Sequence, residues 1–253
     1  MKGLGGSMEL AEVFRDFASD RPPVHRPGYR AGYEDTNGRW QISTPTTHST
    51  DFDCYRFIAH HVGEGSVTME TGLGFSTICL ALLGCHHTAM FLDAAEEAPL
   101  RAWADERGID MGGVRFVIGP SDASLRQMSD DPVDLFFIDG GHGYPLPQLD
   151  WFYGASRLSK GGVLVLDDLQ MWGPLQLDQF LDLDPRWERL ARTLKWSAFR
   201  RKVSGPVAED FDTQEFLPEL PLSRAPTLRR RIHVGISRHL PESVKAPVRR
   251  VLK

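Results

Sequence analysis

Two glycines follow a carboxylate in a segment whose pattern suits ligand binding. Residues 70–77 read ETGLGFST, in which Glu70 ends an apolar run and Gly72 and Gly74 come next. Glycine permits a tight turn and lets a ligand approach the backbone closely. A dinucleotide-binding turn would have a third glycine, but position 77 is Thr. The acid before the turn favours a ligand that carries an ammonium group, and a plain strand-to-helix turn is the alternative.

Polar residues also follow the next two apolar runs. Asp93 ends the segment AMFLD, 21 residues after Gly72. An acid at this place can accept hydrogen bonds from both hydroxyls of a ribose, although a helix cap or a surface charge would look the same. Ser121 and Asp122 follow the run VRFVI. They can lie against an adenine amino group, and a local turn explains them almost as well.

A second cluster combines an imidazole with three carboxylates. Asp139 and His142 lie in the segment DGGHGY, and Asp167 and Asp168 lie in LDDL. Both segments follow apolar runs of neighbouring predicted strands, so these side chains can converge. Carboxylate oxygens suit Mg²⁺, which would lower the pKa of a bound hydroxyl, and a histidine suits a general base. Alternatively, the two adjacent aspartates cap the following segment and His142 only braces its loop.

Other candidate residues have weaker patterns. The pairs His60–His61 and His86–His87 make poor metal sites, because neighbours on a helix point in different directions. Trp172, in the loop after the adjacent aspartates, is expected to form a wall of an acceptor pocket.

The elements that must position these residues alternate between strand and helix. Five strands are expected over residues 66–70, 89–93, 114–118, 134–139 and 162–168. Helices are expected over residues 8–20, 52–61, 76–83, 96–107, 149–158 and 177–183, and a final hairpin over residues 187–192 and 195–202. This order predicts an α/β, doubly wound, Rossmann-like fold with a mostly parallel seven-stranded sheet and a C-terminal antiparallel hairpin. Ligands of such sheets bind at the carboxyl ends of the strands.

In this order, the motifs resemble those of class I S-adenosylmethionine-dependent methyltransferases. The resemblance covers roughly residues 50–202 and is nearest to the catechol O-methyltransferase-like and macrocin O-methyltransferase-like branches. It rests on the segments ETGLGFST, FLDA, GPSDASL, DLFFIDGGHGY and LSKGGVLVLDDL. The ensemble is specific to the superfamily, whereas no single motif is.

The resemblance implies a role for each motif. S-adenosylmethionine would be bound by Glu70, Thr71, Gly72, Gly74, Ser76, Thr77, Asp93, Ser121, Asp122 and Asp139. His142 would be the general base, with Asp139 as the second catalytic residue. In the metal-dependent members, acids at the positions of Asp139, Asp167 and Asp168 hold Mg²⁺. Asp168 stands where the catechol enzymes have an asparagine, a departure that the macrocin-type pattern shares.

Composition and charge limit the remaining possibilities. Of the 253 residues 41% are hydrophobic and 25% charged, which is typical of a globular protein. Three cysteines are too few for a disulfide framework, and neither a signal peptide nor a membrane-spanning run is found, so we expect a cytoplasmic protein. The net charge is −5, but residues 218–253 carry nine Lys or Arg against two Glu, hence +7, which leaves −12 for the rest. This tail can touch an anionic partner or fold back on the acidic body.

These observations predict three regions: an N-terminal extension that can act as a lid (1–50), an S-adenosylmethionine-binding domain (51–205) and a basic extension (206–253). The expected function is O-methylation of a small hydroxylated acceptor, such as a sugar or phenolic unit of a metabolite, with metal assistance as an open question. The alternatives are a metal-independent N- or C-methyltransferase, a non-catalytic S-adenosylmethionine-binding module and a dinucleotide-dependent oxidoreductase. We expect no nucleic-acid partner, and self-association stays open.

Overall fold

The structure is a computed structural model that describes residues 5–20, 32–34, 40–42, 50–207, 214 and 216. The chain divides into two compact units, residues 1–207 and residues 208–253. The predicted basic extension therefore lies almost wholly outside the described residues. Within the described part of the chain, no helix has both the length and the apolar character needed to cross a membrane.

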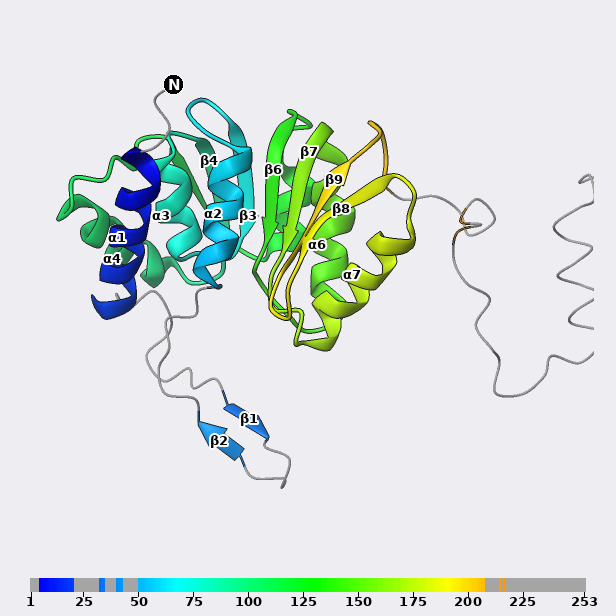
Figure 1. Cartoon of the computed structure of the whole chain (residues 1–253), viewed down its shortest axis with the longest axis horizontal. Coiled ribbons are helices and arrows are strands. Elements are labelled where there is room, and N and C mark those ends of the chain that lie inside the picture. Colours follow the sequence, from blue (N-terminus) through cyan, green and yellow to red (C-terminus); the bar gives the residue numbers. More distant parts are fainter. Residues whose placement is uncertain are drawn as a thin grey trace, which may run out of the picture. The chain divides into compact units, whose positions relative to one another are not determined.

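Seven strands form one sheet in the order β5-β4-β3-β6-β7-β9-β8 (Figure 1). They are β3 (Val67–Thr71), β4 (His86–Phe91), β5 (Val114–Ile118), β6 (Val133–Ile138), β7 (Leu158–Leu166), β8 (Trp187–Arg192) and β9 (Ser197–Arg201). The pairs among β3 to β7 are parallel, whereas β9 is antiparallel to both β7 and β8. The predicted fold class is confirmed. The strand order reverses between β3 and β6, which is where open α/β sheets bind ligands.

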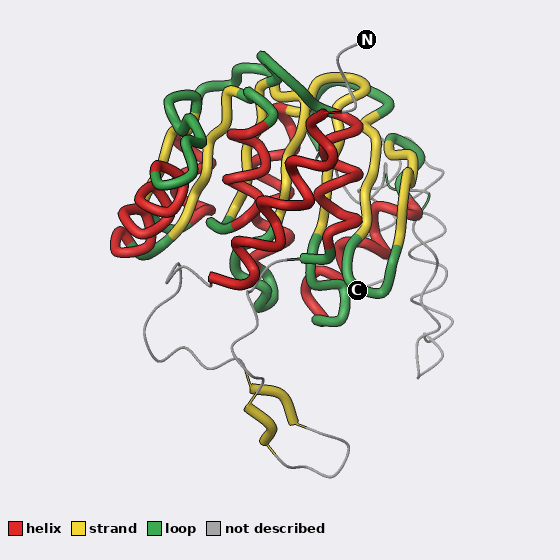
Figure 2. Tube along the Cα trace, turned by 60° about the vertical axis from the view of Figure 1, so that its left-hand side comes forward, coloured by secondary structure: helices red, strands yellow, loops and turns green. Residues whose placement is uncertain are grey.

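Helices cover both faces of this sheet (Figure 2). One apolar core lies under α1 (Gly5–Asp20), α2 (Phe52–His61), α3 (Phe75–Leu82) and α4 (Glu97–Asp105). The other lies under α5 (Ser121–Gln127), α6 (Leu146–Gly154) and α7 (Trp172–Leu183). Two 3₁₀ helices, η1 (Ala94–Glu96) and η2 (Ala155–Arg157), and a separate antiparallel pair, β1 (Gly32–Glu34) with β2 (Trp40–Ile42), complete the described elements.

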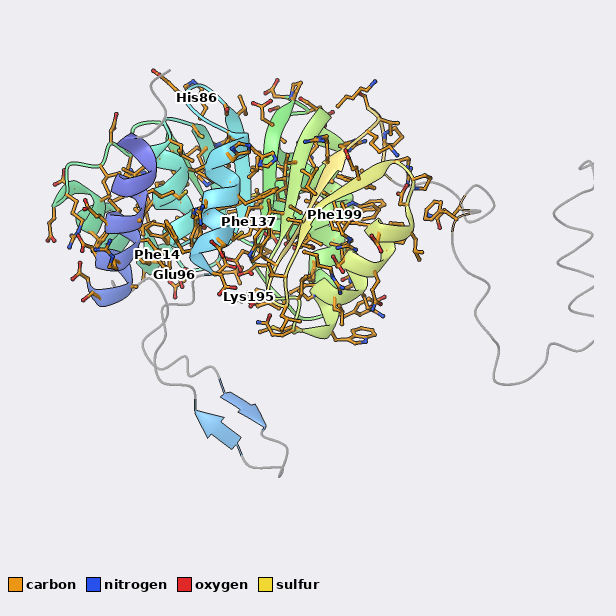
Figure 3. The ribbon with its side chains drawn as sticks, in the orientation of Figure 1. Phe14, His86, Glu96, Phe137, Lys195 and Phe199 are labelled. Carbon is orange, nitrogen blue, oxygen red and sulfur yellow. The ribbon has the colours of Figure 1, made fainter. Side chains whose placement is uncertain are left out.

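The apolar run in β6 explains how one strand serves both cores. Leu135 and Phe137 belong to the core under α1 to α4, whereas Phe136 and Ile138 belong to the other. Side chains alternate between the faces of a strand, so a central parallel strand that is covered on both faces needs apolar residues at all its buried positions. Figure 3 shows Phe137 and Phe199 in the interior of the sheet region.

The helix expected near the N-terminus is part of the core. Phe14 of α1 lies 5.1 Å from Phe52 and 5.0 Å from Phe75, measured between ring centroids. Phe17 meets Trp103 edge-on at 5.0 Å. α1 is therefore held by aromatic packing on α2, α3 and α4. The lid predicted for the N-terminal 50 residues stays a prediction, because most of the segment between α1 and Thr50 lies outside the described residues.

Several predicted element boundaries were wrong. The second strand starts at His86, so His86 and His87 lie on β4 and not on a helix. The helix expected from residue 177 starts at Trp172, because Pro174 falls in its first turn, where proline is tolerated. The sequence analysis predicts no helix at α5, since its seven residues show no clear period. The boundaries of α2, β5 and β8 were predicted correctly.

Candidate active site

The end of β3 is joined tightly to the end of β6. Gly72 has a φ of +110°, and a Cβ added there would lie 2.5 Å from the backbone oxygen of Asp139. The Asp139 backbone N–H donates to the Thr71 carbonyl at 3.0 Å. Only glycine fits this positive φ and this close approach. Gly72 thus brings the two predicted clusters together at the point where the strand order reverses.

Gly74, by contrast, borders open space. A Cβ added at Gly74 would meet no atom within 4 Å, and its backbone is extended, with a φ of 172°. Its N–H donates to Thr77 Oγ1 at 3.3 Å in the first turn of α3. The open side of the turn therefore lies at Gly74 and not at Gly72.

The Glu70 side chain lies beneath this turn. It is fully buried, and its Oε1 accepts hydrogen bonds from Thr77 Oγ1 and, at 3.0 Å, from His87 Nε2. His87 is held in turn by Thr68 at 2.9 Å. Glu70 Oε2 has no hydrogen-bond partner among the described residues. In this structure Glu70 ties β3, β4 and α3 together, and its predicted contact with the methionine end of the cofactor stays a prediction.

The other predicted cofactor residues lie along the same edge of the sheet. Thr71, Ser76 and Thr77 are buried around the glycine turn. Asp93 follows β4 and accepts a hydrogen bond from the Ala95 N–H at 3.0 Å, so it caps η1. This cap coexists with the predicted ribose role, because a carboxylate has acceptor sites left over.

The Ser121 hydroxyl is engaged by a residue that the sequence analysis missed. It donates to Asp150 Oδ1 of α6 at 2.6 Å, and Asp150 is fully buried. Burial raises the pKa of Asp150 to about 6, against the opposing effect of the hydrogen bond from Ser121. Asp150 thereby links the loop predicted for adenine to α6. A lone aspartate in an apolar helix segment was the signal available in the sequence. Asp122 is half-buried in the first turn of α5.

The catalytic and metal candidates converge only in part. Potential ligand atoms of Asp139, His142 and Asp168 all lie within 4.8 Å of one another. His142 Nε2 is 3.0 Å from Asp168 Oδ2. Asp167 is not in this set of three, and its Oδ1 accepts a hydrogen bond from Thr50 Oγ1 at 2.6 Å. The residues predicted as metal ligands are therefore close together, with His142 rather than Asp167 completing the compact set.

A lysine that the sequence analysis missed lies among these carboxylates. Lys195, in the turn between β8 and β9, has its Nζ 2.6 Å from Asp168 Oδ1 and 3.3 Å from Asp167 Oδ2 (Figure 3). The Leu169 N–H donates to the Lys195 carbonyl at 2.8 Å, which fixes the turn against the end of β7. Nothing in the sequence distinguished this lysine from a solvated hairpin residue, since the contact depends on β9 pairing beside β7.

The carboxylates of the cluster differ in their affinity for protons. Burial raises the pKa of Asp139 well above its usual value, and the nearby charges of Asp167 and Asp168 raise it further. Burial also acts to raise the pKa of Asp168, but hydrogen bonds and charge from His142 and Lys195 reverse this and lower it. Asp168 is thus the fixed negative charge of the site, and its backbone adopts a left-handed φ of 57°, which aspartate tolerates better than most residues.

The carboxylates of the cluster suit a divalent cation, but the ammonium group of Lys195 already lies between two of them. Carboxylate oxygens must approach Mg²⁺ to about 2.0–2.1 Å. An ion shared by Asp167 and Asp168 would need the space that Lys195 Nζ takes between them. The predicted metal site therefore requires that Lys195 move away.

Exposed aromatic rings flank the cluster. Tyr144 and Trp172 are 62% and 61% exposed, and their ring centroids lie 5.2 Å apart. Tyr144 follows His142 by two residues, and Trp172 starts α7. A Cβ at Gly173 would lie 2.5 Å from the His142 carbonyl oxygen, so the loop after β6 and the first turn of α7 are in close contact.

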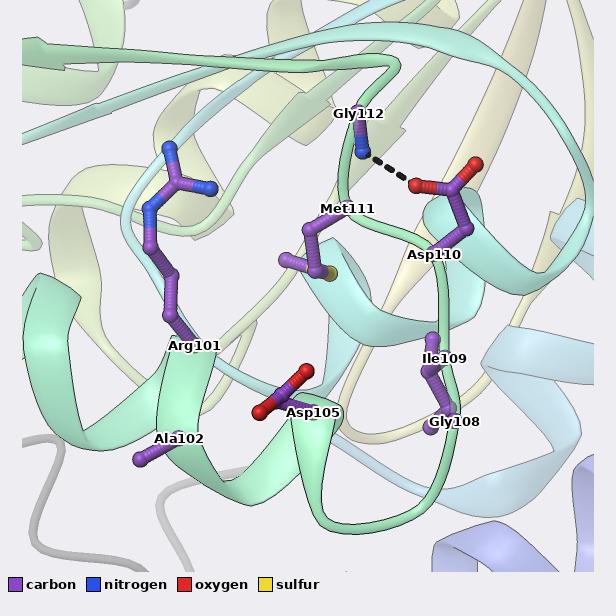
Figure 4. A pocket seen from close by; sticks show the side chains of 8 residues that line it. All are labelled: Arg101, Ala102, Asp105, Gly108, Ile109, Asp110, Met111 and Gly112. Carbon is purple, nitrogen blue, oxygen red and sulfur yellow. Dashed lines mark hydrogen bonds between the residues drawn. The ribbon is translucent and has the colours of Figure 1, made fainter.

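One surface pocket lies away from this chemistry. It has a volume of about 600 Å³ and lies beside the end of α4 and the segment that enters β5, at the opposite end of the strand from its carboxyl terminus (Figure 4). Its lining includes Arg101, Asp105 and Asp110, and Asp110 accepts a hydrogen bond from the Gly112 N–H at 2.7 Å. No predicted site residue lines it.

The strand order, the glycine turn and the acids at the strand ends together define the class of protein. This is the α/β domain of a class I S-adenosylmethionine-dependent methyltransferase. Residues 69–169 match the family model described as a methyltransferase domain, and the chain is a methyltransferase. No curated protein sequence matches this chain.

Solved structures agree on the fold. A candidate O-methyltransferase from Klebsiella pneumoniae is similar with a TM-score of 0.56 at 16% identity, over 76% of this chain and 90% of that one. The O-methyltransferase from Bacillus cereus, in complex with SAH, gives 0.50 at 16%, over 75% and 87%. A candidate rRNA methylase from Clostridium thermocellum gives 0.51 at 12%, over 61% and 96%.

Proposed function

We propose that this methyltransferase transfers the methyl group of S-adenosylmethionine to a hydroxyl oxygen of a small acceptor, with His142 as the general base. The observation that carries the proposal is the 3.0 Å contact between His142 Nε2 and Asp168, beside Asp139 at the carboxyl edge of the sheet. An alcohol or phenol must lose its proton as it is methylated, and a histidine held by an aspartate suits that task.

The step needs little covalent chemistry from the protein. The acceptor oxygen attacks the sulfonium methyl carbon, the C–S bond breaks with its electron pair going to sulfur, and the hydroxyl proton passes to His142. The products are a methyl ether, S-adenosylhomocysteine and an imidazolium that Asp168 stabilises. Alignment of oxygen, carbon and sulfur supplies much of the acceleration. For this reason the protein must bind the donor in one fixed orientation. We propose that Asp93 binds the ribose, Ser121 and Asp122 the adenine, and the glycine turn the methionine end.

The rings of Tyr144 and Trp172 support a small acceptor with a flat or apolar face. Two adjacent exposed aromatics beside a polar cluster offer a stacking surface for a phenolic ring or for the C–H face of a sugar. Likeness to O-methyltransferases supports the same proposal. Methylation of nitrogen or carbon is the alternative. A neutral amine can attack the methyl group before it loses its proton, so its methylation depends less on His142.

The proposal is tested by assaying phenols, catechols and sugar alcohols with labelled S-adenosylmethionine, for the parent and for H142Q. We expect methyl ethers from the parent and a loss of 10²- to 10⁴-fold in kcat for H142Q, because a general base contributes about that much. The control is H86Q, which changes an exposed histidine at the other end of β4. Retention of parental kcat by H142Q, or labelling only of amine acceptors, would contradict the proposal.

A further inference from the structure

The ammonium group of Lys195 is a cation that already lies among the carboxylates of the predicted metal site. Lys195 Nζ is 2.6 Å from Asp168 Oδ1 and 3.3 Å from Asp167 Oδ2. Its side chain is 28% exposed, so the ammonium group is partly withdrawn from solvent. The contact with Asp168 is a charge-assisted hydrogen bond, one of the stronger kinds in proteins, whereas the contact with Asp167 is an ion pair.

Two independent constraints hold the ammonium in place. The turn that carries it is held to the end of β7, because the Lys195 carbonyl accepts from Leu169 N–H at 2.8 Å, and it is braced internally, because the Lys195 N–H donates to Thr193 Oγ1 at 3.1 Å. On the other side, Asp167 is held by Thr50 Oγ1 at 2.6 Å. Both partners of the ion pair are therefore fixed by their own elements.

We propose that Lys195 is the resident cation of this active site and that it takes the place of a divalent metal ion. This inference rests on the proposed O-methylation. An ammonium group has three N–H donors, of which the hydrogen bond to Asp168 uses one and a second can face Asp167, its ion-pair partner. The third donates to the acceptor oxygen and stabilises the negative charge that develops as His142 removes the proton. The atom balance of the transfer is unchanged, because Lys195 neither gains nor loses a proton.

The position of Lys195 also predicts exclusion of metal. Mg²⁺ demands near-octahedral oxygen ligands at about 2.0–2.1 Å. A positive charge between Asp167 and Asp168 both blocks that approach and repels the ion. Removing the ammonium should therefore convert the cluster into a metal site, since the three carboxylates would then lack their cation.

The test measures binding of Mn²⁺, by electron paramagnetic resonance, to the full chain and to its K195A, K195M and K160A variants. Lys160 is an exposed residue of β7 and serves as the control. We expect no Mn²⁺ at the cluster of the parent or of K160A, and about one equivalent bound to K195A. Turnover of the parent should survive chelation, whereas K195M should lose about 100-fold in kcat, the effect expected on removing one oriented donor to a developing oxyanion.

The inference would be overturned if the parent bound one equivalent of Mn²⁺ that a D168N variant lost, if chelation abolished parental turnover, or if K195M kept parental kcat without metal. Titration of each variant with S-adenosylhomocysteine checks that the donor site is intact. Mn²⁺ binding needs no acceptor. A parent that methylates no hydroxyl therefore counts against the proposed function alone, and the Mn²⁺ titration still decides the role of Lys195.

Discussion

At the scale of residues, the site depends on one fixed negative charge. Asp168 receives His142 on one oxygen and Lys195 on the other, and these two contacts lower its pKa although burial acts to raise it. An aspartate that stays ionised can orient the imidazole and stabilise it once protonated. The adjacent Asp139 differs, because burial and two neighbouring carboxylates raise its pKa.

A prediction at this scale concerns the donor ribose. Replacing Asp93 by Asn keeps an oxygen that can accept from the Ala95 N–H, but removes the charge and one acceptor. Hydrogen bonds to charged groups contribute about 1.5–3 kcal/mol, so we expect the Kd for S-adenosylhomocysteine to rise about tenfold or more by calorimetry. D105N, an exposed change on α4, is the control. Unchanged affinity in D93N would exclude the ribose role.

At the scale of elements, the turn from β3 to α3 separates a structural glycine from a ligand-facing one. G72A would place a Cβ 2.5 Å from the Asp139 carbonyl oxygen at a positive φ, whereas G74A adds its Cβ to open space. We expect G72A to lower the melting temperature by several degrees and G74A to leave it nearly unchanged. G74A should instead weaken binding of S-adenosylhomocysteine, by about tenfold. The reverse assignment of the two effects would show that the donor does not approach Gly74.

A second prediction at this scale concerns Asp150, where α6 meets the start of α5. Its pKa is about 6 in the folded chain and 3.8 ordinarily. The carboxyl favours folding most below pH 4, where it is protonated in both states. This contribution falls as the pH rises from about 4 to 6, by on the order of 3 kcal/mol, since one pKa unit is about 1.4 kcal/mol.

The D150N variant is neutral at every pH and should escape that loss. We expect the free energy of unfolding of D150N, measured by urea denaturation, to increase relative to that of the parent as the pH rises from 4 to 6.5. S121A with an intact Asp150 serves as a comparison, because it removes the hydrogen bond but leaves the titrating group. A difference between D150N and the parent that does not vary with pH would contradict this account.

The sequence predicted the elements with strong local patterns and missed contacts made by distant segments. We could predict the strands β5 and β6 and the glycine turn from the sequence, because apolar strands and tight turns have local sequence patterns. Lys195 and Asp150 were missed, since their partners come from other elements: Asp168 after β7 and Ser121 of α5. The insertion of β9 between β7 and β8 had no local signature either, and it is what brings Lys195 to the site.

At the scale of the whole molecule, the predicted donor residues follow β3, β4 and β5, and the predicted acceptor cluster follows β6 and β7. The two groups therefore lie at the carboxyl edge of one sheet, on either side of the strand-order reversal. α1 adds aromatic rings to the core, so the chain before residue 50 contributes to the domain itself. The surface pocket near Gly108 lies apart from this edge and plays no part in the proposal. The basic segment after residue 217 is outside the described residues, and its predicted contact with an anionic partner stays a prediction.

The most direct test is a crystal structure of the full chain with S-adenosylhomocysteine. We predict the ribose hydroxyls on Asp93, the adenine beside Ser121 and Asp122, and the sulfur over the Gly74 turn, facing Asp139, His142 and Lys195. A ligand bound elsewhere, or a sulfur turned away from His142, would contradict the account.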